Sequence, residues 1–237
     1  MDYDYIRENL SNIHENIETA CSKSGREADS VKLIAVSKTK PFEDLLSAYN
    51  AGERIFGENK VQEICSKYER IGELPGAVFH LIGHLQTNKV RQVIDKVAMI
   101  HSVDSLHLAQ AIDKEAARAG RIMDVLIEVN VADEESKFGI SCDETEDLVR
   151  ECAKLHNIHV CGLMTIAPFV ENSEENRHYF KKLKQLCVDL KAKNIDNTDM
   201  DVLSMGMTGD YQVAIEEGAT MVRVGTGIFG ARNYNVQ

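Results

Sequence analysis

Short apolar runs alternate with amphipathic stretches along most of this chain. Each apolar run predicts a buried strand, and each stretch with apolar residues at every third or fourth position predicts a helix. We expect eight strands, at residues 33–36, 54–57, 77–83, 97–103, 123–131, 158–165, 202–205 and 221–225. One further amphipathic helix precedes the first strand, with Ile6, Leu10, Ile13 and Ile17 on one face.

The alternation of strands and helices predicts a parallel sheet covered by helices. Eight strand–helix units in 237 residues match the usual size of a (β/α)8 TIM barrel, which is about 250 residues. An open, doubly wound sheet is the alternative, because a count of strands alone does not show that a sheet closes. The chain has three prolines and no linker-like stretch, so we expect one domain over residues 1–237.

The composition narrows the classes of partner. A net charge of −11 would repel nucleic-acid backbones, so we expect no nucleic-acid partner. We also expect no membrane contact, because no apolar run approaches the ~18 residues of a span. The acidic start of the chain lacks the apolar core of a signal peptide. The six cysteines match no zinc or disulfide framework, which favours reduced thiols and a cytoplasmic location.

Lys38 lies at the carboxyl end of the first expected strand. The apolar residues Leu33–Val36 run almost directly into it, and the carboxyl ends of barrel strands are where active sites form. A lysine there is a structural charge, a phosphate clamp or an amine nucleophile. Desolvation beside the core favours the neutral, nucleophilic amine. Lys40 shares the strand parity of Lys38, and for both residues the alternative is a solvated charge beside a strand.

Two glycine-rich loops follow the seventh and eighth expected strands. Residues 225–230 match G-x-G-x-x-G, but the helix, second strand and acidic residue of a dinucleotide fold do not follow. Residues 204–210 add hydroxyl groups and two more glycines. In barrels a phosphate commonly binds at these two loops, held by backbone N–H groups. The sequence therefore indicates a phosphate site, with two tight turns as the alternative.

Two polar residues near the expected strands have more than one interpretation. Arg223 lies inside the apolar run 221–224, so its charge needs either an internal ion-pair partner or a ligand. Asn59 follows the second strand, where asparagine is also common for turn formation. Neither residue identifies a function by itself.

The histidines give no metal-binding pattern. His80 and His84 are four residues apart, but they lie on a strand and its loop rather than on one helix face. His156 and His159 flank the start of a strand, where we expect surface residues. We therefore predict no metal site.

Seven stretches together resemble one known family. They are residues 35–41 (AVSKTKP), 56–63 (FGENKVQE), 80–89 (HLIGHLQTNK), 136–139 (SKFG), 162–164 (GLM), 203–207 (LSMGM) and 222–230 (VRVGTGIFG). In this order and spacing the chain resembles the pyridoxal phosphate (PLP) homeostasis proteins, the YggS/PROSC-type PLP-binding proteins. The resemblance implies a barrel similar to the N-terminal domain of alanine racemase and to that of the eukaryotic ornithine decarboxylases.

The resemblance implies a role for the lysine and for the two glycine-rich loops. Lys38 would form a Schiff base with the cofactor, pyridoxal 5'-phosphate. Contacts to the phosphate would come from Ser204, Thr208, Gly225 and Thr226. The family usually has serine at the position of Thr208, and the threonine keeps a hydroxyl group there.

Two further residues would face the ring of the cofactor. The resemblance implies that Asn59 lines the cofactor and that Arg223 lies near the pyridine nitrogen. Arginine only donates hydrogen bonds and stays protonated, so it leaves that nitrogen unprotonated. The ring is then a poorer electron sink, which makes carbanion chemistry harder.

The family's role implies a carrier that holds PLP and supplies it to apo-enzymes in vitamin B6 homeostasis. Alanine racemases carry a second domain that supplies a catalytic tyrosine, and nothing follows the last barrel unit here, so we expect a non-catalytic protein. A PLP-dependent racemase-like or decarboxylase-like enzyme, with Lys38 as base, is one alternative. A barrel that binds another phosphorylated ligand without a Schiff base is the other.

We expect a monomer that contacts apo-enzymes transiently. The sequence does not identify these enzymes. It also leaves open whether a second lysine, such as Lys137, binds PLP during transfer.

Overall fold

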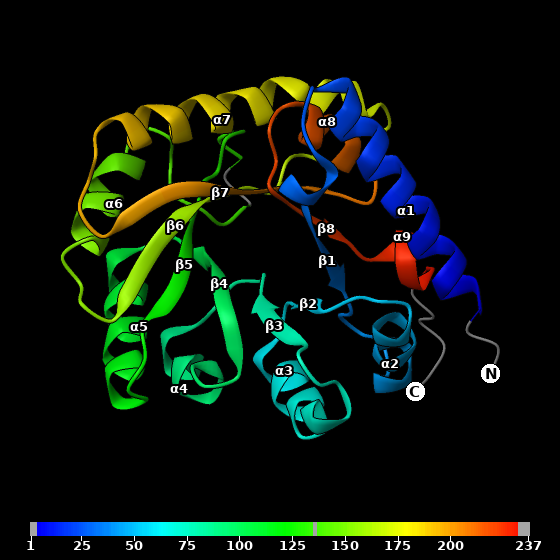
Figure 1. The fold of residues 1–237 in the computed structure, drawn as a ribbon. Helices are drawn as coiled ribbons and strands as arrows, with labels where there is room; N and C mark the ends of the chain where they lie inside the picture. The colour runs from blue at the N-terminus through cyan, green and yellow to red at the C-terminus, as the bar shows by residue number, and fades with distance from the viewer. Residues whose placement is uncertain (1–3, 135–136, 232–237) are drawn as a thin grey trace.

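Eight parallel strands form a closed barrel in the computed structural model, which describes residues 4–134 and 137–231 (Figure 1). Ser136, part of one of the seven stretches above, lies outside the described residues. The strands are β1 (Lys32–Val36), β2 (Ile55–Glu58), β3 (Val78–Leu81), β4 (Val97–Val103), β5 (Met123–Glu128), β6 (Ile158–Met164), β7 (Thr198–Met207) and β8 (Met221–Val224). Pairing of β1 with β8, for example Lys32 with Met221, closes the sheet. The TIM-barrel prediction is therefore confirmed, and the open sheet is excluded.

Helices cover the outside of the barrel (Figure 1). The α-helices are α1 (Asp4–Lys23), α2 (Phe42–Asn50), α3 (Val61–Tyr68), α4 (Val90–Val93), α5 (Leu106–Arg118), α6 (Thr145–Cys152), α7 (Arg177–Ala192), α8 (Tyr211–Glu216) and α9 (Thr226–Phe229). Short 3-10 helices are η1 (Ala28–Ser30), η2 (Ile71–Glu73), η3 (Thr87–Lys89) and η4 (Ser173–Asn176). No helix within the described ranges is both long and apolar enough to span a membrane.

The expected extra helix at the start of the chain is α1. It packs along α8 and α9 on one side of the barrel (Figure 1). Ile6, Leu10, Ile13 and Ile17 are all buried, so its apolar stripe is the face that meets the barrel. The first helix of the described chain therefore packs against its last two helices.

Apolar side chains form two separate layers. The larger layer lies between the strands and the surrounding helices and includes Phe56, Phe79 and Phe180. The smaller layer fills the barrel interior with Ile34, Val36, Ile82, Met99, Leu126, Cys161, Met164 and Met221. Because this interior is packed, ligands reach the barrel at its ends and do not pass through it.

Candidate functional site

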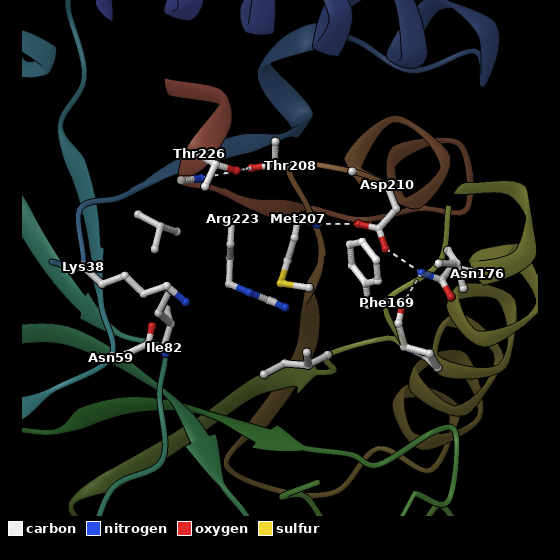
Figure 2. A pocket seen from close by; sticks show the side chains of 16 residues that line it. Lys38, Asn59, Ile82, Phe169, Asn176, Met207, Thr208, Asp210, Arg223 and Thr226 are labelled. Atoms are coloured by element: carbon white, nitrogen blue, oxygen red, sulfur yellow. Dashed lines mark hydrogen bonds between the residues drawn. The ribbon is translucent and has the colours of Figure 1, made fainter. Parts of the chain in front are cut away.

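A cavity of ≈550 Å³ lies at the carboxyl ends of the strands (Figure 2). Ligand pockets in proteins commonly have volumes of about 300–1,000 Å³. Its walls come from the ends of β1, β2, β3, β7 and β8 and from the loop after β6. The lining residues are Val36, Lys38, Asn59, Ile82, Ile166, Pro168, Phe169, Val170, Asn176, Met207, Thr208, Gly209, Asp210, Arg223, Gly225 and Thr226.

Lys38 and Lys40 take different directions at the end of β1. The side chain of Lys38 projects into the cavity toward Arg223 (Figure 2). The Lys40 amine donates a hydrogen bond to the backbone carbonyl of Phe229 at 2.6 Å. Their shared strand parity therefore does not give them a shared position, and Lys38 is the one that reaches the cavity.

A buried ion pair fixes the backbone just before Lys38. The Ser37 hydroxyl donates to Glu58 Oε1 at 2.6 Å, and Lys67 Nζ donates to the Ser37 carbonyl at 2.8 Å. Lys67 Nζ also lies 2.6 Å from Glu58 Oε1. Burial raises the pKa of Glu58, and the nearby Lys67 ammonium opposes that rise. These contacts hold the end of β1, and so the start of the Lys38 side chain, in one place.

The Thr208 hydroxyl oxygen accepts hydrogen bonds from residues that follow β8. Its Oγ1 accepts hydrogen bonds from the backbone N–H groups of Gly225 and Gly227, each at 3.3 Å. The Thr226 hydroxyl donates to the same oxygen at 3.2 Å. Two backbone N–H groups and two hydroxyls thus converge beside the cavity, and such a cluster can bind an anion.

Arg223 is held from below the cavity by a buried hydroxyl. Its Nη1 donates to Ser204 Oγ at 2.6 Å, and its Nη2 donates to the Thr165 carbonyl at 2.7 Å. The side chain is buried, and desolvation lowers its pKa to about 10, so it stays charged at neutral pH. The guanidinium is therefore a fixed cationic donor group in the cavity wall.

Two buried histidines continue this network into the barrel. Ser204 Oγ lies 3.0 Å from His101 Nδ1, and His101 Nε2 lies 2.9 Å from His80 Nδ1. Burial lowers the pKa of His80 to about 4 and that of His101 well below its usual value. Both rings are neutral at neutral pH, so the only charge on this chain of groups is the one on Arg223.

The loop after β7 is held by a carboxylate. Asp210 accepts a hydrogen bond from the Met207 backbone N–H at 2.7 Å and another from the Asn176 amide at 2.8 Å. The same amide donates to the Pro168 carbonyl at 2.9 Å, which joins the loops after β6 and β7 (Figure 2). The position of Thr208 in the cavity depends on this arrangement.

Asn59 lines the cavity because Gly83 leaves room behind it. A Cβ atom on Gly83 would lie 2.6 Å from the Asn59 carbonyl oxygen and 2.7 Å from its Cα. Any other residue at position 83 would push the loop after β2 away from the loop after β3.

The chain matches the family model described as alanine racemase, N-terminal domain, over residues 9–233. It is 46% identical to a pyridoxal phosphate homeostasis protein of Aquifex aeolicus over 227 residues, which is 96% of this chain and 98% of the relative. The chain belongs to the pyridoxal phosphate homeostasis protein family. The family resemblance inferred from the sequence is thus confirmed.

Two solved structures are similar to this family member over nearly their full length. An unknown protein from Bifidobacterium adolescentis is 37% identical, with a TM-score of 0.90 and 97% of each chain covered. PipY of Synechococcus elongatus PCC7942, solved with PLP bound, is 34% identical, with a TM-score of 0.82. That match covers 95% of this chain and 100% of PipY.

The structure brings most of the sequence-predicted site residues together. Lys38, Asn59, Thr208, Arg223, Gly225 and Thr226 all line the cavity. Ser204 is different: it is fully buried, is not a lining residue, and accepts its hydrogen bond from Arg223. Its strand continues past it to Met207, so the side chain lies below the rim instead of on it.

Several lining residues were missed by sequence reasoning. Asp210 and Asn176 form the hydrogen bonds between the loops after β6 and β7, and the exposed Phe169 forms part of the cavity wall. Asp210 lies in the loop that the sequence singled out, but nothing in the sequence pairs it with Asn176, 34 residues away. Lys137 does not line the cavity and instead pairs with Glu134 at 2.7 Å.

Proposed function

We propose that this protein binds PLP through a Schiff base on Lys38 and acts as a PLP carrier in vitamin B6 homeostasis. The observation that carries the proposal is one cavity that contains both the Lys38 side chain and the donor cluster around Thr208. An aldehyde with a phosphate group needs both an amine and an anion site. The family name and the PLP in PipY support the same ligand.

The lining residues fit the chemical groups of PLP. The Lys38 amine would condense with the aldehyde, forming a C=N bond and releasing water. The N–H group of Gly225, with the hydroxyls of Thr208 and Thr226, would receive the phosphate, and the Gly227 N–H group would support the Thr208 hydroxyl, to which it donates.

The remaining polar groups fit the ring. Arg223 would face the pyridine nitrogen, and Asn59 would line the ring. We assign Ser204 to the support of Arg223, through the bond at 2.6 Å, in place of a phosphate contact. PLP would supply an electrophilic carbon, and the protein would determine how tightly that carbon is held.

We propose a non-catalytic role, because proton transfer on two faces of a substrate needs a second acid or base opposite Lys38. The titratable side chains among the described lining residues are Lys38, Asp210 and Arg223. Both carboxylate oxygens of Asp210 accept hydrogen bonds, and Arg223 stays protonated. These features favour reversible storage and transfer to apo-enzymes over turnover.

We further infer that residues 1–237 act as one PLP-binding domain, as a monomer in the cytoplasm. The six cysteines are free thiols, which supports a reducing compartment. Apo-enzymes that receive the cofactor would meet the protein at the cavity mouth.

An absorbance titration with PLP tests the Schiff base. We expect wild-type protein to develop the imine absorbance band and Lys38→Ala to lack it. Lys40→Ala is the matched control and should keep the band, because the Lys40 amine is bonded to the Phe229 carbonyl. A band that survives in Lys38→Ala would contradict the assignment. Phosphate-sensitive binding without a band in wild-type protein would favour the non-covalent alternative.

An amino-acid turnover assay tests the carrier role. PLP-loaded protein incubated with D-alanine or L-alanine should racemise or decarboxylate it no faster than free PLP does. Turnover clearly above that of free PLP, and absent in Lys38→Ala, would support the enzyme alternative instead.

Thr226→Val tests the phosphate site. We expect PLP to bind roughly tenfold more weakly, because one hydrogen bond to a charged oxygen is lost. Thr226 is exposed, so the free energy of unfolding should stay within about 0.5 kcal/mol of wild type. An unchanged dissociation constant for PLP would show that the phosphate binds elsewhere.

A further inference from the structure

Three side chains with metal-ligating atoms meet at the amino-end of the barrel, opposite the cavity. Asp124 is the second residue of β5, and His159 and Cys161 are the second and fourth residues of β6. His159 Nδ1 lies 3.1 Å from Asp124 Oδ1 and 3.4 Å from Cys161 Sγ. The three ligand atoms all lie within 4.8 Å of one another.

These separations are close to those that a tetrahedral zinc ion requires. Zinc lies at about 2.0–2.1 Å from histidine nitrogen, 2.3 Å from thiolate sulfur and 2.0–2.2 Å from carboxylate oxygen. At tetrahedral angles the nitrogen is then about 3.4 Å from the oxygen and about 3.6 Å from the sulfur. The distances in the protein, 3.1 and 3.4 Å, differ from these by a few tenths of an ångström.

A fourth residue, Asp199, lies where metal sites usually have a carboxylate that contacts a metal-binding histidine but not the metal. Asp199, the second residue of β7, has Oδ2 3.3 Å from His159 Nε2. Metal-binding histidines commonly donate their second ring N–H to a carboxylate, which fixes the tautomer. With Nε2 donating to Asp199, the lone pair of Nδ1 faces Asp124 and Cys161. This contact is an observation independent of the three-residue cluster.

The backbone of β6 aims Cys161 at the cluster. Asp124 pairs in register with His159, and Val125 with Val160, but Leu126 pairs with Gly162. Cys161 is therefore the extra residue of a β-bulge, with no partner in β5. Bulges commonly redirect side chains at functional positions.

We propose that Asp124, His159 and Cys161 form a three-ligand site for Zn²⁺, with Asp199 positioning His159. Binding breaks the S–H bond of Cys161, forms an S–Zn bond and releases one proton to solvent. A water molecule would complete the tetrahedron. Because the site joins β5 and β6 and its outer carboxylate lies on β7, the ion would stabilise this part of the barrel. The site is independent of the proposed PLP function.

The test titrates metal-free protein with Co²⁺ and then displaces Co²⁺ with Zn²⁺. Wild-type protein should give the thiolate-to-cobalt charge-transfer band and a zinc-dependent rise in the melting temperature. Cys161→Ser should lose the band, and Asp199→Ala should bind roughly 10–100-fold more weakly. Cys65→Ser is the matched control, because Cys65 lies on α3, and it should behave as wild type.

Asp124→Asn is a second test variant, needed because Cys161 is buried and Cys161→Ser could lose the band by misfolding. Half of the Asp124 side chain is exposed, 49%, so this change should leave the fold intact while weakening Co²⁺ binding at least tenfold. The proposal is overturned if wild-type protein shows no charge-transfer band. It is also overturned if the Asp124 and Cys161 variants bind Zn²⁺ as tightly as wild type does, because the contacts of His159 with its two aspartates then belong to no metal site.

Discussion

At the scale of single residues, the position of Lys38 is set by neighbours that touch no ligand. Ser37, Glu58 and Lys67 form a buried set of hydrogen bonds directly before it. Glu58 is fully buried and Lys67 is 7% exposed, and the Lys67 ammonium lies 2.6 Å from Glu58 Oε1. A buried charge that loses its partner is strongly destabilising, whereas replacing both partners by apolar groups is often tolerated.

Lys67→Met should therefore lower the free energy of unfolding by about 3–5 kcal/mol, since it leaves the Glu58 carboxylate without its cation. Urea denaturation at pH 7 measures this change. The double variant Glu58→Met with Lys67→Met is the control and should recover at least half of the loss. A loss below about 1 kcal/mol in the single variant would contradict the account.

Local motifs locate a side chain best where it lies at a strand end or in a short loop. Lys38 lies just after a strand, Thr208 and Thr226 lie in the two glycine-rich loops, and all three line the cavity. Ser204 lies in the same quoted stretch as Met207, yet the length of β7 places it beneath Arg223. Sequence spacing does not reveal how far a strand continues past a given residue.

At the scale of elements, β-bulges determine which side chains meet. The register shifts between β6 and both of its neighbours near Cys161, and Gly162 follows the bulge with φ +155°. A Cβ atom at this position would overlap the backbone carbonyl of Val202 on β7. The close approach of these strands therefore requires glycine.

Gly162→Ala should destabilise the barrel by more than about 3 kcal/mol, because the backbone of β7 must move away from β6. Gly72→Ala is the matched control: no atom lies within 4 Å of its added Cβ, so it should stay within about 0.5 kcal/mol of wild type. Thermal unfolding of both variants measures the difference. Equal melting temperatures would show that β6 and β7 are not tightly apposed.

Strands and helices were predicted well in kind but less well in extent. The apolar runs predicted all eight strands, whereas β7, expected over residues 202–205, is longer, at Thr198–Met207. The absence of a metal site stays a prediction, made from histidine and cysteine spacings within short stretches, and the zinc site proposed above departs from it. The Asp124–His159 contact joins two strands 35 residues apart, which no local spacing reveals.

At the scale of the whole molecule, the barrel interior contains ionisable groups as well as apolar ones. Glu128 is buried, and desolvation, with a contribution from Asp104, raises its pKa to about 7. In the unfolded chain its pKa is near 4.5. The folded state therefore binds more protons between pH 4.5 and 7, and this contribution to stability is lost as the pH rises through that window.

Glu128→Gln removes this titration. The difference in unfolding free energy, variant minus wild type, should increase by about 2.5 kcal/mol between pH 5 and pH 8. His80, whose pKa of about 4 gives the opposite trend, is present in both proteins and cancels in the difference. Urea unfolding of both proteins at several pH values between 5 and 8 measures this difference in unfolding free energy. A difference that does not change with pH would show that Glu128 is already ionised at low pH.

Closure of the barrel could be expected only from the number of units and from the family resemblance. Pairing of β1 with β8 depends on the combined twist and stagger of all the strands, which single-strand patterns do not contain. Closure is what brings Lys38, near the start of the chain, against Thr208 and Thr226.

The proposed function requires that Lys38 holds PLP covalently. Borohydride reduction of the PLP-loaded protein would convert the C=N bond to a stable amine, and peptide mapping by mass spectrometry would locate the added mass. We predict that mass on Lys38 in wild-type protein and in Lys40→Ala, and on no peptide of Lys38→Ala. A label on another lysine, such as Lys137, with Lys38 unmodified, would contradict the account.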